Sequence, residues 1–262
     1  QHLQIATGEH QFLAHAVDYH LAGGHIHGIL LLQFLNPLIA LAAVAMNTSH
    51  IRIGTMVTPL PRRRPWKLAR ETMTLEHLSN GRLILGVGSG PGGEEFEGFG
   101  EFTDARTRAA MLDEGLAVLT GLWSGEPLTF TGGHYTVDNI RFEPRAIQQP
   151  RIPVWVGGIW PHKAPLRRAV RWDGAFPIIP DPGDAHLVQV REAVEFIRAE
   201  RAKQENAGSP FDIVINGDTW GQSPDEAAAT VNAFAAAGVT WWLERLSPEI
   251  EGGAYRDPEW PL

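Results

Sequence analysis

The amino-acid sequence predicts an α/β protein with the (β/α)8 architecture of a TIM barrel. Eight short apolar runs alternate with segments of helical periodicity along the 262 residues. Most of the runs are continuously apolar, which is typical of parallel strands covered by helices. Eight such units fit a closed barrel better than an open sheet. The predicted strands cover residues 3–6, 25–32, 51–57, 83–87, 154–156, 175–179, 211–215 and 239–243.

Local signals place the helices between these strands. Residues 65–78 have helical periodicity and are followed by Gly81, a residue typical of helix ends. Ser223-Pro224-Asp225-Glu226 is a capping box that predicts the start of another helix. Thr103 and Asp184 are each expected to cap a further helix.

Two other features of the chain are predicted from its pattern. Residues 10–21 are expected to form a helix, and residues 126–150 a β-hairpin around Gly132-Gly133, inserted into one domain that spans 1–262. Trp241 and Trp242 are adjacent in the last strand, so one is expected to face the barrel interior and the other the helices.

Composition excludes several classes of protein. Hydrophobic residues make up 44% of the chain and charged residues 20%, as in ordinary globular proteins. The absence of cysteine excludes disulfide scaffolds, thiolate metal sites and cysteine nucleophiles. A net charge of −8 disfavours a general nucleic-acid surface, and no apolar run is long enough to predict a membrane span. With no signal peptide in view, we expect a cytoplasmic protein.

Gly157-Gly158 end a predicted strand, and a helix is expected to begin near Pro161. Helix N-termini bind phosphate through unpaired N–H groups, and glycines let the backbone approach an anion closely. Lys163 adds positive charge nearby. The pattern therefore predicts a phosphate site, with a tight turn as the alternative. Because these glycines are expected in a loop at the barrel mouth, Gly158→Val is expected to weaken binding without unfolding the protein.

His25-Ile26-His27 has the spacing of a metal-binding pair on a strand. The pair opens its predicted strand and so lies at the bottom of the barrel, away from the end where TIM-barrel chemistry takes place. We therefore expect no metal site, and a metal-dependent hydrolase is the weakest of the functional alternatives.

Several motifs together resemble the bacterial-luciferase-like family of flavin- and deazaflavin-dependent oxidoreductases. They are Ile51-Arg52-Ile53-Gly54-Thr55-Met56-Val57-Thr58-Pro59, Leu78-Ser79-Asn80-Gly81-Arg82-Leu83-Ile84-Leu85-Gly86-Val87-Gly88, Phe130-Thr131-Gly132-Gly133-His134-Tyr135 and Pro153-Val154-Trp155-Val156-Gly157-Gly158. The resemblance runs from about residue 37 to 243 and implies a TIM barrel with FMN or coenzyme F420 as cofactor. It also implies a small-molecule substrate, a separate flavin or F420 reductase and a homo-oligomer.

The resemblance assigns cofactor-binding roles to Thr55, Met56 and Val57, where family members often carry a non-prolyl cis peptide behind the isoalloxazine ring. One departure concerns residues 31–37, which lack the histidine that the family usually has there. The family's catalytic histidine is therefore not carried over, and the catalytic residues are unknown.

Gly88-Ser89-Gly90-Pro91-Gly92-Gly93 matches a dinucleotide-binding fingerprint formally. Pro91 and the acidic pair Glu94-Glu95 argue against a pyrophosphate site, and no helix is expected at Gly93. We interpret the segment as a loop at the barrel mouth, with Ser89 and Gly90 near the cofactor. Glu94 and Glu95 are weak candidates for an acid or base, the alternative being a solvated charge pair.

Two functional hypotheses follow from the resemblance. The first is an oxidoreductase: with reduced FMN it would oxidise or hydroxylate a small organic substrate as a monooxygenase, and with F420 it would transfer hydride. The second is a non-catalytic flavin-binding barrel, which the shortened 33–37 segment favours.

Overall fold

The computed structural model describes residues 4–5, 16–21, 24–29, 36–180, 183–219 and 221–244. Side chains are described from Asn36 onward, apart from those of Glu95 and Asp184. Among the described helices, none is both long and apolar enough to cross a membrane.

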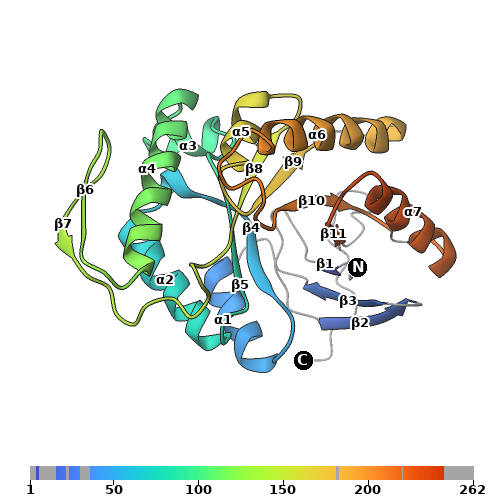
Figure 1. Cartoon of the computed structure of the whole chain (residues 1–262), viewed down its shortest axis with the longest axis horizontal. Coiled ribbons are helices and arrows are strands. Elements are labelled where there is room, and N and C mark those ends of the chain that lie inside the picture. The colour runs from blue at the N-terminus through green and yellow to red at the C-terminus, as the bar shows by residue number, and fades with distance from the viewer. Residues whose placement is uncertain are drawn as a thin grey trace.

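A curled sheet of seven parallel strands forms the centre of the molecule (Figure 1). Its order is β1-β11-β10-β9-β8-β5-β4. From β4 to β11 the neighbours follow one another along the chain once the added hairpins are set aside, and the first strand, β1, pairs with the last, β11. This order has no reversal of direction of the Rossmann kind. Seven of the eight predicted strands lie in this parallel sheet. The strands are β1 (Gln4–Ile5), β4 (Ile53–Pro59), β5 (Leu83–Gly88), β8 (Val154–Ile159), β9 (Gly174–Ile178), β10 (Asp212–Gly217) and β11 (Trp241–Glu244).

The closed barrel predicted from the sequence is not found. In the described part of the chain, β1 and β4 are the two edges of the sheet and do not pair with each other. The predicted strand at 25–32 forms β3 (Gly24–Ile29), which pairs antiparallel with β2 (Ala16–Leu21) in a separate hairpin. The prediction of a helix over 10–21 is therefore wrong for residues 16–21. From Val17 to Leu21 apolar and polar residues alternate, which is the period of a strand.

His25 and His27 lie in β3, where the backbone pairs them with His20 and Asp18. They therefore lie in the hairpin, and the prediction that they open a barrel strand is wrong. Their side chains lie outside the described part of the structure.

Helices cover the outer face of the sheet (Figure 1). Outward-facing strand residues pack with them in one large core, whereas Ile84, Trp155, Phe176, Val214 and Leu243 form a second core on the concave face. The helices are α1 (Pro37–Asn47), α2 (Pro65–Leu78), α3 (Glu94–Gly98), α4 (Ala105–Trp123), α5 (Lys163–Ala169), α6 (His186–Arg201) and α7 (Pro224–Ala236), with short 3-10 turns η1 (Leu60–Arg62) and η2 (Gly183–Ala185).

Helix ends follow the sequence signals in part. The capping box of Ser223 and Glu226 is confirmed at the start of α7. The cap of α4 is Asp104 and not Thr103, because the Asp104 carboxylate accepts the N–H of Thr107. The N-cap of α6 is Ala185, one residue after the expected Asp184, and no side chain caps that helix.

The pair Trp241-Trp242 divides as predicted between the two faces of β11. Trp242 packs against Phe234 of α7, with ring centroids 5.0 Å apart. Trp241 meets Trp155 edge to face inside the curled sheet, at 4.9 Å. Strand alternation thus separates the helix-facing core from the concave face.

The segment between α4 and β8 carries the antiparallel hairpin of β6 (Leu128–Thr131) and β7 (Thr136–Ile140). Its tip is attached to α4 by Glu114, whose carboxylate accepts the backbone N–H groups of Gly133, His134 and Tyr135. These hydrogen bonds lower the pKa of Glu114 against the opposing effect of desolvation. That the hairpin is an insertion in a single domain stays a prediction.

Arg82 joins three elements at the N-terminal end of the sheet. Its guanidinium donates to the carbonyl oxygens of Ala45, Thr48 and Ile51 at 2.9, 2.8 and 2.7 Å, and to that of Ser79 at 2.7 Å. The end of α1, the start of β4 and the turn after α2 are thereby held together.

We expect Arg82→Met to lower the free energy of unfolding by about 2–3 kcal/mol, because several half-buried carbonyl oxygens lose a charged donor. Urea unfolding followed by circular dichroism measures the change. Arg64→Met is the matched control, since Arg64 is exposed. Equal stability of the two variants would contradict this role for Arg82.

Candidate functional site

A bulge in β4 shapes the concave face of the sheet. Thr55 pairs with Leu85 of β5, and Thr58 pairs with Val87. Two residues, Met56 and Val57, therefore lie opposite the single residue between Leu85 and Val87, which is Gly86. The Met56–Val57 peptide is cis, as the family resemblance implied.

Glycines in β5 make room for this bulge. A Cβ on Gly86 would lie 2.0 Å from the Thr55 carbonyl oxygen and 2.8 Å from the Met56 sulfur. A Cβ on Gly88 would lie 3.1 Å from Val57 Cγ2. These two roles were not predicted, although the spacing of glycines at 86 and 88 within one strand is a signal of close backbone approach.

Buried hydroxyl groups brace the bulge on both sides. Thr55 donates to the Gly86 carbonyl oxygen at 2.9 Å, and Thr58 donates to the Thr55 hydroxyl at 2.8 Å. Both threonines are buried. Thr55 therefore supports the bulge from within the protein, while Met56 and Val57 remain partly accessible on the concave face.

An apolar surface extends from the bulge across the mouth of the curled sheet. Gly157 lies beside Val57, since a Cβ on Gly157 would be 3.0 Å from Val57 Cγ1 and 3.7 Å from Ile178 Cδ1. Beneath this surface the interior is closed by Phe176, Val214 and Leu243, which have no exposed area. Val57, Gly157 and Ile178 thus form a shallow floor, which we call the mouth floor.

Gly158 has a different role from the one predicted. It is buried within β8 and is not in a loop, and a Cβ there would lie 2.4 Å from Pro165 Cβ of α5. The absence of a side chain lets α5 pack on the strand. The premise that Gly158 lies in a mouth loop is therefore wrong, and we expect Gly158→Val to disturb the packing of α5 on β8.

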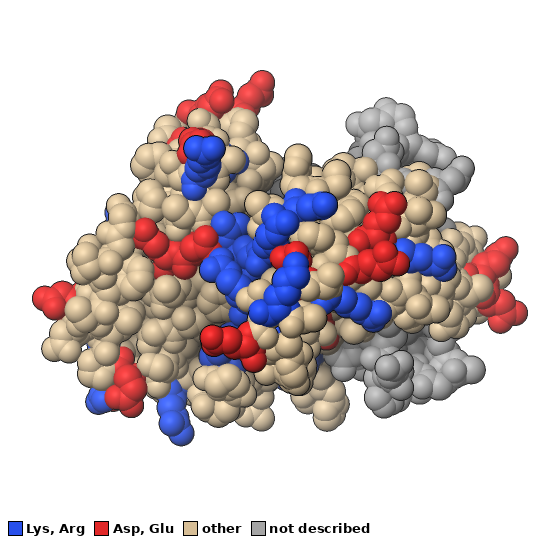
Figure 2. Space-filling view, turned by 45° about the horizontal axis from the view of Figure 1, so that its top comes forward, with Lys and Arg blue, Asp and Glu red and all other residues tan. Residues whose placement is uncertain are grey.

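The basic residues after β8 have partners on the outer layer. The helix begins at Lys163, later than expected, and the Lys163 ammonium lies 5.4 Å from the ring of Phe196 on α6. Arg168 makes two hydrogen bonds to Asp113 of α4, at 2.8 and 3.0 Å. Hydrogen bonds and charge from Arg168 and Arg171 lower the pKa of Asp113, although desolvation opposes them. Figure 2 likewise shows Lys and Arg intermixed with acidic side chains on this face of the molecule.

The glycine-rich segment after β5 lies at the carboxyl end of that strand. Ser89 and Gly90 are partly accessible, and Gly90 has a φ of 77°. A short helix, α3, does begin after Gly93, contrary to the prediction, but it has only five residues. Glu94 is exposed at its start, and the side chain of Glu95 is not described. Nothing in these contacts assigns an acid or base.

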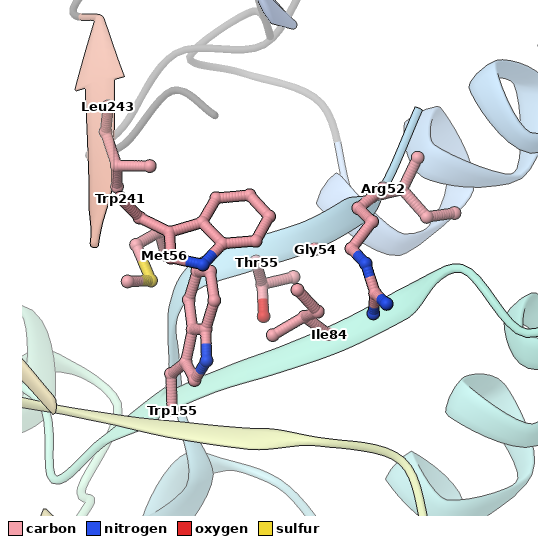
Figure 3. A pocket seen from close by; sticks show the side chains of 9 residues that line it. Arg52, Gly54, Thr55, Met56, Ile84, Trp155, Trp241 and Leu243 are labelled. Carbon is pink, nitrogen blue, oxygen red and sulfur yellow. The ribbon is translucent and has the colours of Figure 1, made fainter. Parts of the chain in front are cut away.

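A separate small cavity lies deeper in the interior, below the bulge (Figure 3). It is lined by Arg52, just before β4, and mainly by residues from the first halves of strands, among them Gly54, Ile84, Trp155 and Trp241. Chemistry in TIM-barrel enzymes takes place at the opposite, carboxyl end of the strands. We therefore place the candidate site at the mouth floor and not in this cavity.

Asp212 begins β10 close to this interior region. Burial raises the pKa of its carboxyl, and a hydrogen bond from the Thr240 hydroxyl, at 3.0 Å, partly opposes that effect. No group of three His, Cys, Asp or Glu side chains among the described residues could hold a metal ion.

Comparison with known proteins identifies the family. The model of the luciferase-like monooxygenase family matches residues 5–258, so the chain belongs to this family. The resemblance inferred from the sequence is thereby confirmed.

The relatives include enzymes of both cofactor types. The chain is 31% identical over 152 residues to the oxygenase component of a flavin-dependent trigonelline monooxygenase from Acinetobacter baylyi, covering 58% of this chain and 38% of that protein. It is 34% identical over 154 residues to an F420-dependent hydroxymycolic acid dehydrogenase from Mycobacterium tuberculosis, covering 58% and 42%. The chain thus spans well under two thirds of the length of either relative.

Solved structures agree on the fold. An F420-dependent secondary alcohol dehydrogenase superposes with a TM-score of 0.66 at 17% identity, covering 95% of this chain and 86% of that one. The oxygenating constituent of a diketocamphane monooxygenase from Pseudomonas putida gives 0.65 at 16% identity, covering 93% and 81%.

We expect Gly86→Ala to destabilise the protein by about 3 kcal/mol or more, because the added methyl group overlaps the Thr55 carbonyl oxygen and displaces the bulge. Thermal unfolding measures the effect. Gly208→Ala is the control, since nothing lies within 4 Å of a Cβ at that position. A Gly86→Ala protein as stable as this control would contradict the close approach of β4 and β5.

The raised pKa of Asp212 predicts a pH-dependent stability. Between the carboxyl's unfolded and folded pKa values the folded state binds more protons, so the contribution of Asp212 to stability falls as pH rises through this window. Asp212→Asn keeps an acceptor for Thr240 and removes this loss. We expect the variant to be more stable than the wild type at pH 7 and equally stable below about pH 3.9.

Urea unfolding at a series of pH values tests this expectation. Asp138→Asn serves as the control because Asp138 is exposed on β7. If the free energy of unfolding of Asp212→Asn exceeded that of the wild type by more at acid pH than at pH 7, the expectation would be contradicted, and the carboxyl would be stabilised in its charged form.

Proposed function

We propose that this protein is an oxidoreductase that binds FMN or coenzyme F420 on the mouth floor and acts on a small organic substrate. The observation that carries the proposal is the bulge at Met56–Val57, which stands at the mouth of the sheet and depends on glycines at 86 and 88. The family match and the presence of both flavin- and F420-dependent relatives support it.

The residues present fit the planar part of such a cofactor. Val57 and Ile178 offer apolar side chains, and Gly157 between them leaves a space that any larger residue would fill. A flat, largely apolar ring would cover this floor and remove it from water. When bound, the cofactor would supply the electrons or hydride, and the protein would orient it and limit access of water.

Backbone groups at the rim would hold the rest of the cofactor. We place Ser89 and Gly90 beside its ring, and its phosphate near Gly157, Gly158 and Lys163, as the resemblance implies. Gly158 contributes by letting α5 pack closely against β8, which brings the start of α5 to the rim. Any contribution of Lys163 requires its ammonium to leave the Phe196 ring.

The choice of cofactor determines the partner. With FMN, we propose a monooxygenase that receives reduced flavin from a separate reductase, since the trigonelline relative is named as an oxygenase component. With F420, we propose a dehydrogenase or reductase supplied by an F420 reductase. A homo-oligomer also stays a prediction.

Titration of the protein with FMN and with F420 tests the proposal. We expect one of the two to bind, and Gly157→Val to weaken that binding at least tenfold, because its side chain would occupy the mouth floor beside Val57. Fluorescence measures binding, and circular dichroism checks the fold.

Gly208→Val is the matched control and should bind as the wild type does. If the wild type bound neither FMN nor F420, the proposed function would be contradicted. Binding without turnover in the presence of substrates and reductase would favour the non-catalytic flavin-binding barrel.

A further inference from the structure

Asn216 is a polar residue on the otherwise apolar concave face of β10. Along this strand Ile213 and Ile215 pack in the core that faces the helices, and Val214 packs in the core of the concave face. Because strand side chains alternate, Asn216 lies on the same face as Val214. It was not among the residues singled out from the sequence.

The register of the sheet places Asn216 at the mouth. Asn216 pairs with Leu243 near the end of β11, one step beyond the pairing of Val214 and Trp241 on that face. Asp212 pairs with Gly174 of β9, and Asn216 and Ile178 each lie four residues further along these parallel strands, toward the mouth. Val214 is fully buried, whereas Asn216 is only partly buried. Asn216 therefore borders the mouth floor at the end away from Val57.

The carboxamide of Asn216 has no hydrogen-bond partner among the described residues. By contrast, Thr55 and Thr58 bind within the bulge, and Glu244 accepts from Thr219 N and Trp242 Nε1 at 2.6 and 2.7 Å. An amide offers two donors and two acceptor sites. The Asn216 side chain is only partly buried, and its amide is not among the buried polar atoms without a partner, so it is accessible to water and to a ligand. It is therefore available to hydrogen-bond to a molecule bound at the mouth.

We propose that the Asn216 carboxamide hydrogen-bonds to the polar edge of the cofactor ring that lies on the mouth floor. This inference rests on the proposed function. The ring systems of flavins and deazaflavins end in an edge of alternating carbonyl and N–H groups, and a carboxamide complements that edge. The floor is apolar from Val57 through Gly157 to Ile178 and becomes polar at Asn216, which matches a ring with one apolar and one polar end.

Binding of FMN, riboflavin and F420 to Asn216→Leu tests this assignment. Leucine has a similar volume and lacks the amide. We expect Asn216→Leu to weaken FMN and riboflavin by the same factor, about three- to tenfold, because both ligands carry the same ring. If the protein prefers F420, its binding should weaken to the same extent. The visible absorption spectrum of the bound ligand should also shift, since that spectrum responds to hydrogen bonding at the ring.

Asn232→Leu is the matched control, because Asn232 is exposed on α7, and it should bind as the wild type does. Asn216→Ala gives the same test without added bulk if the leucine variant does not fold. Unchanged affinity and spectrum in a folded Asn216 variant would overturn the inference and leave the proposed function intact. A loss confined to FMN, with riboflavin unaffected, would overturn it by placing Asn216 at the phosphate. Failure of the wild type to bind any of the three would overturn both proposals.

Discussion

The close approach of β4 to β5 at Gly86 is the constraint on which the site depends. Parallel strands normally keep one residue opposite one residue, and here two residues of β4 occupy the space opposite a single glycine. The extra residue directs the Val57 side chain toward the mouth, and Gly88 leaves room for that side chain. Any side chain at 86 would overlap the Thr55 carbonyl oxygen, so the bulge and the glycine must occur together. The hydroxyls of Thr55 and Thr58 then hold the bulge through hydrogen bonds within the protein, and no ligand is needed to stabilise it.

The concave face is divided into two levels with different properties. The lower level is a packed core of aromatic and aliphatic side chains, in which Phe176, Val214 and Leu243 have no exposed surface. Such packing gives the upper level a rigid support, as in other barrels whose interiors are filled by layers of side chains. The upper level has small or partly exposed residues, Gly157, Ile178 and Asn216, and these leave space for a ligand. The lower level of these strands is therefore rigidly packed, and the upper level of the same strands is accessible.

Much of the architecture was predictable because strand and helix periodicities are local. Seven strands and the capping box of α7 were found from such patterns, and the family motifs identified the bulge at Met56–Val57. The hairpin of β2 and β3 was missed because the alternating stretch of β2 is short and was read as the end of a longer helical segment. Gly86 and Asn216 were missed for another reason. Their significance lies in what stands opposite or beside them on neighbouring strands, and the sequence does not contain that register.

The case of Gly157-Gly158 shows how one motif serves two purposes. The sequence presented both glycines as parts of an anion site, yet adjacent residues of a strand face opposite sides of the sheet. Gly158 faces the helices and admits Pro165 of α5, whereas Gly157 faces the mouth and lies beside Val57. Arg168, which follows on α5, is neutralised by Asp113, and Lys163 lies over Phe196. These charged side chains near the rim thus already interact with side chains of the helical layer. Under the proposed function, affinity for a cofactor would therefore come chiefly from the apolar floor, the backbone around it and the polar groups at its edges. That requirement would give the few polar side chains there that lack a protein partner their importance.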